Sequence, residues 1–162
     1  MKLSRVALAA TLVLSSAFAI AESTARTQFD QLKALEGNWA GKDQEGRTVE
    51  VIFRITARGS ALMSEIHGHG SEDMITMFHL DGDRLMMTHY CAAGNQPRFT
   101  VASADATSVS FDFLDGTNIG PRDGHMQHVV LSQPDANHHT ESWLFIAPGG
   151  EKKEFFTLER SK

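Results

Sequence analysis

The chain has 162 residues, of which 41% are hydrophobic, and a formal net charge of −5 at pH 7. This length is enough for one domain with a hydrophobic core of its own. The acidic balance, without any cluster of Lys and Arg, excludes the basic surface that is typical of nucleic-acid-binding proteins. No basic amphipathic helix indicates attachment to a membrane surface.

The first 21 residues have the pattern of a secretory signal peptide. Two basic residues precede an apolar run at residues 6–14, and small residues follow up to Ala21. The apolar run is too short to span a membrane as a helix. We predict cleavage after Ala21, with Ala19 as the alternative position, and hence a periplasmic or secreted protein. An uncleaved N-terminal anchor is the other interpretation.

Cys91 is the only cysteine in the chain, so no internal disulfide can form. The core must therefore supply the stability of the domain. We interpret Cys91 as a buried, inert thiol, because free cysteine is among the most buried residue types. A reactive thiol and an intermolecular disulfide are the alternatives.

A short helix comes first in the expected mature chain, at residues 27–35. Phe29, Leu32 and Leu35 recur there at helical spacing, and Gly37 can end the helix. The rest of the chain is a series of short segments rich in β-branched and aromatic residues. These segments predict ten strands, at residues 39–41, 48–57, 61–67, 74–80, 84–91, 97–103, 108–114, 124–132, 139–146 and 154–159.

Strands that follow one another about every ten residues, joined by short turns, are typical of an antiparallel meander. The strongest turn signals are Asp-Gly-Asp at 81–83 and Pro-Gly-Gly at 148–150, and the longest loop is 115–123. A meander leaves two open edges unless it closes. We therefore predict that residues 22–162 form a closed antiparallel up-and-down β-barrel of about ten strands with a short N-terminal helix. A β-sandwich is the alternative.

Residues 35–41 read LEGNWAG and lead into the first predicted strand. The Gly-x-Trp-x-Gly pattern resembles the signature that opens lipocalins and other calycin barrels, in which the Trp closes the barrel floor. Further stretches resemble a largely uncharacterised family of bacterial lipocalin-like proteins, many of which are exported. Together they extend the likeness over nearly the whole mature chain. These stretches are residues 78–85, 88–91, 94–98, 124–128 and 141–143. The resemblance implies a calycin-type β-barrel and no particular reaction.

The same opening resembles, more distantly, that of the heme-binding nitrobindin barrel. Nitrobindin barrels have a longer opening that is richer in glycine, whereas this chain continues after Gly41 with KDQEG. We predict no cofactor, and a heme or a divalent metal is the alternative.

Residues 85–99, LMMTHYCAAGNQPRF, combine an apolar strand with an unusual set of polar side chains. Met87, His89 and Cys91 alternate onto one face of the strand. Methionine-rich walls suit an adaptable apolar pocket. The other face of this strand is also apolar, which predicts that the helix or a second subunit covers it.

The turn that follows this strand supplies three further candidates. Asn95 and Gln96 can bond loop backbone or face a ligand. Arg98 has a planar guanidinium suited to a carboxylate or a phosphate, so it would favour an anionic head group. The alternative for Arg98 is an ion pair with Glu141 or Asp112 across the barrel.

Eight histidines is a high count for this length. His125 and His128 are three residues apart on a predicted strand, so they face opposite ways and one of them can join His89. His67 and His69 have a spacing that suits a metal, but the glycines around them favour a polar loop. The proximity of His89 to Cys91 is compatible with nucleophilic catalysis, yet no nucleophile elbow or oxyanion motif accompanies it.

These observations predict an exported binding protein that holds a small amphipathic or hydrophobic molecule in the barrel lumen. The predicted ligand-binding residues are Met87, His89, Cys91, Asn95, Gln96, Arg98, His125 and His128. Trp39 and Trp143 are interpreted as core and floor residues. One alternative is a heme-binding or metal-binding barrel, or an enzyme, that uses lumen histidines. The other is a filled barrel with a structural or partner-binding role, in which the two-sided apolar strand forms a homodimer surface.

Overall fold

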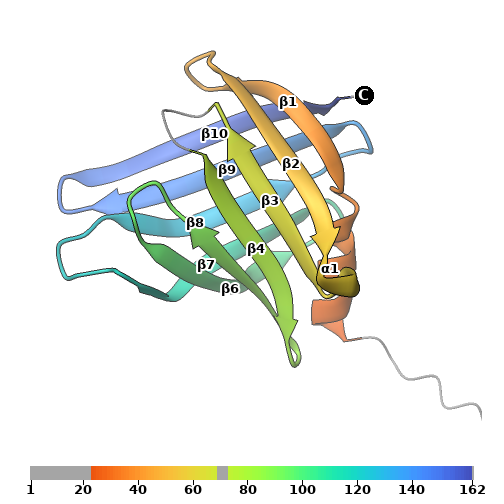
Figure 1. Cartoon of the computed structure of the whole chain (residues 1–162), viewed down its shortest axis with the longest axis horizontal. Helices are drawn as coiled ribbons and strands as arrows, with labels where there is room; N and C mark the ends of the chain where they lie inside the picture. Colours follow the sequence, from red (N-terminus) through yellow and green to blue (C-terminus); the bar gives the residue numbers. More distant parts are fainter. Residues whose placement is uncertain (1–22, 69–72, 162) are drawn as a thin grey trace, which may run out of the picture.

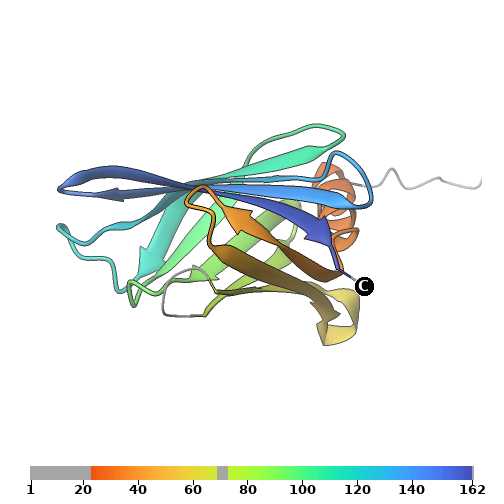
Figure 2. The same ribbon diagram turned by 90° about the horizontal axis from the view of Figure 1, so that it is seen from above.

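The computed structural model describes residues 23–68 and 73–161, which form a closed antiparallel β-barrel with a helix at one end (Figures 1 and 2). The barrel is built from ten strands: β1 Gly37–Asp43, β2 Thr48–Thr56, β3 Ala61–His67, β4 Met74–Asp81, β5 Arg84–Tyr90, β6 Gln96–Ala104, β7 Ser108–Thr117, β8 His125–Ser132, β9 His138–Ala147 and β10 Gly150–Arg160. Each strand pairs with its neighbours in the sequence, and β1 pairs with β10 to close the barrel. The predicted fold class is confirmed. The predicted signal peptide and His69 lie outside the described residues.

The helix α1 spans Thr24–Lys33 and begins three residues before the predicted start. Ser23 explains the difference, because its side chain accepts a hydrogen bond from the backbone N–H of Arg26 at 3.2 Å and caps the helix. A short 3-10 turn, η1 at Ala57–Gly59, joins β2 to β3. Within the described ranges, no helix has the length and apolar character needed to cross a membrane.

The Gly-x-Trp-x-Gly stretch has a steric basis at the seam between β1 and β10. A Cβ atom on Gly41 would overlap the carbonyl oxygen of Thr157 on β10, so only glycine allows the two strands to approach. Gly37 has a φ of +128°, which an L side chain rarely adopts. Between these two glycines Trp39 is buried, and its indole N–H donates to the carbonyl oxygen of Leu35 at 2.7 Å.

Arg160, at the end of β10, fastens the end of the barrel that carries α1. Its guanidinium lies 4.2 Å from the ring centroid of Trp39. The guanidinium also donates to three backbone carbonyl oxygens, those of Ala34, Glu36 and Ala136. The apolar side of α1 belongs to the same core cluster as the lumen residues. The helix therefore closes this end of the lumen, and the opposite end is the mouth of the barrel.

Within the described chain, the outer face of β5 is only partly buried. Met86 is buried, but Thr88 is only half-buried and Tyr90 is 49% exposed. The helix packs its apolar side on the end of the barrel core, through Ala25, Phe29 and Leu32, and there it contacts β4 and β5. The inner face of β5 is buried throughout.

Candidate functional site

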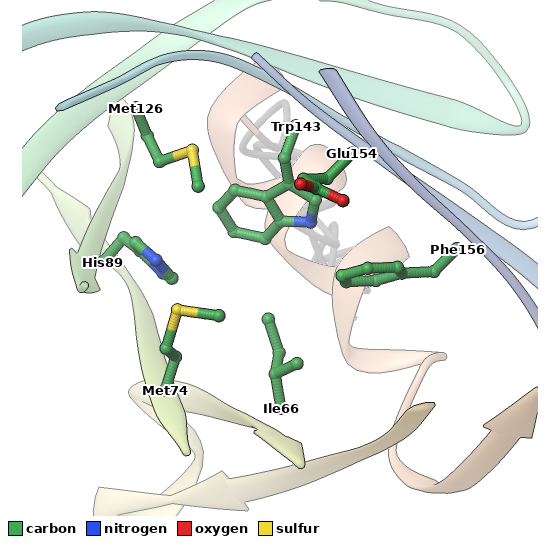
Figure 3. Close-up of a pocket in the computed structure, with 7 residues that line it drawn as sticks. All are labelled: Ile66, Met74, His89, Met126, Trp143, Glu154 and Phe156. Carbon is green, nitrogen blue, oxygen red and sulfur yellow. The ribbon is translucent and has the colours of Figure 1, made fainter. Parts of the chain in front are cut away.

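A small cavity lies in the lumen, in the half toward the mouth. Side chains from β3, β4, β5, β8, β9 and β10 point toward its central space (Figure 3), and they are Ile66, Met74, His89, Met126, Trp143, Glu154 and Phe156. The space among these atoms, including the part that is open to solvent, is about 210 Å³, but the centre of a water molecule can occupy only about 10 Å³ of it. This is room for about one water molecule. A porphyrin does not fit, so the lining residues do not form a heme site in this conformation.

His89 provides the cavity with a polar atom that is not yet bonded. The side chain is fully buried, and its Nδ1 lies 2.9 Å from the hydroxyl oxygen of Thr76. Its Nε2 is also buried and has no hydrogen-bond partner within the described part of the chain. Burial lowers the pKa of His89 to about 4, because the charged imidazolium would lose its hydration. The ring is therefore neutral at neutral pH.

The contact between His89 and Thr76 follows from a tight turn. Gly82 and Asp83 connect β4 to β5, and Gly82 has a φ of +59°. This turn sets Asp81 opposite Arg84, and the same register sets Thr76 opposite His89. Both side chains face the lumen and are buried. The local sequence therefore determines that Nδ1 contacts Thr76 and that Nε2 is the nitrogen that faces the cavity without a partner in the described chain.

Trp143 lies beside His89, with the ring centroids 4.7 Å apart. Its indole N–H donates to Oε2 of Glu141 at 2.8 Å, and Oε1 of Glu141 lies 3.0 Å from Nε2 of His139. Nδ1 of His139 lies 3.0 Å from the carbonyl oxygen of Ser132. Since a carbonyl oxygen only accepts, this Nδ1 carries a proton and donates it. One chain of hydrogen bonds thus runs from the closed half of the lumen to the cavity wall and fixes the indole.

Glu154 places a carboxylate in the same wall. It lies opposite Trp143 in the register of β9 and β10, and it is only 4% exposed. Lys152 reaches it from the mouth, with Nζ 2.5 Å from Oε1, although most of the lysine side chain is exposed. Gln44 donates to Oε2 at 3.3 Å. The wall of the cavity therefore combines a paired carboxylate, two aromatic rings and a neutral imidazole.

Three of the predicted site residues lie near the cavity or in the core beside it. His89 lines the cavity. Met87 is fully buried in the core cluster, on the same face of β5. Cys91 is half-buried and packs against that cluster, and burial raises the pKa of its thiol. This environment suits an inert thiol better than a nucleophile.

Two further predicted residues, Asn95 and His125, make contacts between neighbouring segments at the mouth. Asn95 is buried, and its amide donates to the carbonyl oxygen of Gly124 at 2.8 Å, which ties the β5–β6 turn to the loop before β8. The ring of His125 packs on Phe113, with centroids 4.3 Å apart. The described chain offers no hydrogen-bond partner to Oδ1 of Asn95 or Nδ1 of His125. Neither residue lines the cavity.

The remaining three predicted residues lie on the outer wall, so the predicted set does not converge on one point. Arg98 forms two hydrogen bonds with Asp115, both 2.6 Å long. His128 lies 2.6 Å from a carboxylate oxygen of Asp112, and Gln96 accepts hydrogen bonds from Thr117 and Asn118.

Strand alternation explains why Arg98 lies outside the lumen. Arg98 pairs with Thr88 across β5 and β6, so the two side chains share a face. His89 follows Thr88 and faces the other way. His128 turns outward because of an irregularity in the β8–β9 pairing between Met126 and His128. An anionic head group held by Arg98 in the lumen is thus inconsistent with the fold.

Six lining residues were not predicted as site residues: Ile66, Met74, Met126, Trp143, Glu154 and Phe156. Trp143 was interpreted as a core or floor residue, and it also lines the cavity. Glu154 had a usable signal, because the turn at Pro148 and Gly149 sets Ala147 opposite Gly150 and therefore Trp143 opposite Glu154. The positions of the two methionines depend on how all the strands close around the lumen.

Among residues 23–68 and 73–161, no group of three or more His, Cys, Asp or Glu side chains could hold a metal ion. His67 lies on the outer wall, where Nδ1 is 3.0 Å from Asp73 and Nε2 is 3.4 Å from Glu65. The hydrogen bond to Asp73 raises the pKa of His67. This histidine thus belongs to a surface ion-pair cluster in the described chain.

No protein-family model matches the sequence, and no curated protein matches it. The fold is similar to the crystal structure of Rv2717c from M. tuberculosis, with a TM-score of 0.54 and 16% sequence identity. The likeness covers 83% of this chain and 97% of that chain. At this identity it shows the fold alone, a closed antiparallel barrel that both proteins share.

Proposed function

We propose that the chain is an exported binding protein whose barrel lumen holds a small, mainly apolar molecule with one polar group. The observation that carries this proposal is the unbonded Nε2 of His89 at a small apolar cavity. A buried polar atom left without a partner costs about 1–3 kcal/mol. A guest that bonds this nitrogen would recover that free energy, and apolar side chains would contact the rest of the guest.

The cavity as it stands is smaller than a typical ligand pocket. Met74 and Met126 form part of its wall. Methionine side chains are unbranched and flexible, so they can move apart for a guest. A compact guest of a few carbon atoms fits this arrangement better than a long lipid does.

Export is the second part of the proposal and rests on the signal-peptide pattern of residues 1–21. The test is intact mass measurement of the protein from the culture medium or the periplasm of a producing bacterium. We expect a chain that begins at residue 22. A full-length chain in the cytoplasm would contradict export and would leave the lumen site unaffected.

The binding proposal is tested by native mass spectrometry of the protein purified from its own compartment, with a denatured sample as the control. We expect a reproducible added mass that is lost on denaturation. The variant His89→Leu should lose it, whereas Arg98→Ala, which changes only the outer wall, should keep it. An added mass that His89→Leu retains would refute this site.

The small size of the cavity favours one competing function, a filled barrel with a structural or partner-binding role. That function predicts a bare mass in the same experiment. It also predicts that small apolar molecules added to the purified protein do not perturb the NMR signals of the cavity residues. Both results together would replace the binding proposal.

A further inference from the structure

The chemistry of the cavity wall restricts the charge of a guest. Glu154 lies opposite Trp143 in the strand register and two residues before Phe156 on β10, and all three line the cavity. Figure 3 shows the carboxylate and both aromatic side chains on the same side of the central space. Aromatic faces attract cations, and a carboxylate neutralises them.

The carboxylate of Glu154 already attracts an ammonium group. Nζ of Lys152 lies 2.5 Å from Oε1, and Gln44 donates to Oε2. Arg47 also interacts electrostatically with Glu154, but its main partner is Asp43, with Nε 2.6 Å from Oδ2. A carboxylate that is 4% exposed requires such cations. The lysine side chain is 64% exposed, so it can leave toward solvent.

His89 faces the same space as a neutral ring with one available nitrogen. If Nδ1 carries the proton and donates it to Thr76, Nε2 is a lone-pair acceptor. Such an acceptor binds an N–H donor of a guest. An anionic guest would instead lie against the carboxylate of Glu154, and the nearby ammonium of Lys152 is already paired with that carboxylate.

Resting on the proposed function, we infer that the lumen selects a small organic amine in its protonated, ammonium form. Glu154 balances the charge, the rings of Trp143 and Phe156 contact the carbon and hydrogen atoms next to the nitrogen, and Nε2 of His89 accepts one N–H. The guest takes the place of the Lys152 ammonium at the carboxylate, and Lys152 moves toward the mouth.

The test compares two probes of nearly equal size and shape, tert-butylammonium and tert-butanol, which differ in charge. Each is titrated into the full chain near neutral pH and followed by the NMR signals of His89 and Trp143. We expect the affinity for the ammonium ion to be at least about tenfold higher than the affinity for the alcohol. This preference isolates the charge of the guest from its shape.

Two variants connect this preference to the carboxylate. Glu154→Gln should bring the affinities for the two probes within about threefold of each other. Lys152→Gln removes the competing ammonium and should tighten binding of tert-butylammonium several-fold, without the same gain for tert-butanol. Lys153→Gln, an exposed residue one position along β10, is the matched control and should change neither affinity. Because Lys152 is mostly exposed, its variant tests the inference even if Glu154→Gln does not fold.

The outcomes separate the inference from the proposed function. Equal binding of both probes, or tighter binding of the alcohol, would overturn the amine inference and leave a binding lumen in place. Binding of neither probe would overturn both. A preference for the ammonium ion that Glu154→Gln leaves unchanged would also overturn the inference, because the charge would then be recognised elsewhere.

Discussion

The two halves of the lumen differ in whether their buried histidines are fully hydrogen-bonded. In the half near α1, His139 and Glu141 are bonded to each other, and their remaining polar atoms bond the Ser132 carbonyl and the Trp143 indole. In the half near the mouth, His89 keeps one nitrogen without a partner in the described chain, beside a cavity. The polar side-chain atoms of His139 and Glu141 are thus all hydrogen-bonded, whereas Nε2 of His89 can still accept or donate a hydrogen bond.

This difference indicates that the two buried histidines have different roles. A fully bonded polar cluster rigidifies the interior and specifies one arrangement of side chains. An unbonded buried nitrogen costs stability, and such groups in native structures call for an explanation of another kind. We therefore expect His139 to contribute to stability and His89 to the binding role proposed above, and the following predictions test this division.

The largest effect is expected for Glu141→Leu. This change leaves Nε2 of His139 and the N–H of Trp143 buried without partners, and loss of one member of a buried pair costs roughly 3–5 kcal/mol. Glu141→Gln keeps an acceptor for the indole and a donor for a neutral His139, so it should cost about 1 kcal/mol. Urea unfolding measures both values. A leucine variant as stable as the glutamine variant would show that the cluster contributes little.

The pH dependence of stability is the next largest effect. Because the pKa of His89 falls from 6.5 to about 4 on folding, the unfolded chain binds the proton more readily. The free energy of unfolding therefore includes the full contribution of the neutral ring above about pH 6.5. This contribution is lost as the pH falls through 4, which lowers the free energy of unfolding by about 3 kcal/mol in total. Urea unfolding of the wild type and of His89→Gln at several pH values separates the pH dependence caused by His89 from that caused by the nearby Glu154–Lys152 pair. Parallel pH profiles would contradict a buried neutral His89.

A double variant in the mouth half should cost much less than Glu141→Leu. Thr76→Val combined with His89→Leu removes both partners of one hydrogen bond and the unbonded nitrogen. We expect a stability within about 1 kcal/mol of wild type, or above it, since replacing both partners by apolar groups can be neutral or stabilising. Thr76→Val alone leaves both nitrogens of His89 unbonded and should be less stable than the double variant. The opposite order would contradict the proposed division of roles.

The smallest effect is expected on the outer wall. Arg98 and Asp115 form an exposed pair, with side chains about half accessible to solvent. Exposed pairs contribute about 0–1 kcal/mol. Arg98→Ala should therefore change the unfolding free energy by less than about 1 kcal/mol and leave binding in the lumen unchanged. Loss of lumen binding in this variant would show that the outer wall and the cavity are coupled.

The fold was largely predictable because its signals are local. Alternating apolar residues define the strands, and short turns with glycine separate them. The two-residue turns also determine register: Asp81 opposite Arg84 implies Thr76 opposite His89, and Ala147 opposite Gly150 implies Trp143 opposite Glu154. Two strand pairings that place cavity residues could therefore be derived from the sequence by counting back from each turn.

The partners of Arg98 were less predictable because they depend on irregularities in the sheet. A register shift between Arg98 and Phe99 pairs Arg98 with Asp115, whereas Thr100 pairs with Asp112. The sequence around these residues carries no signal for such a bulge. The two expected partners are engaged elsewhere: Glu141 bonds His139 and Trp143, and Asp112 lies beside His128. At His128 a similar irregularity between Met126 and His128 moves a candidate side chain from the lumen to the surface.

The seam between β1 and β10 determines when this barrel can be completed during synthesis. The strands that meet there are the first and the last of the barrel, so Arg160 can contact Trp39 only after all ten strands have been made. Until then the sheet keeps two open edges, and contacts this distant in sequence form slowly. The barrel can therefore close only after its tenth strand has been made.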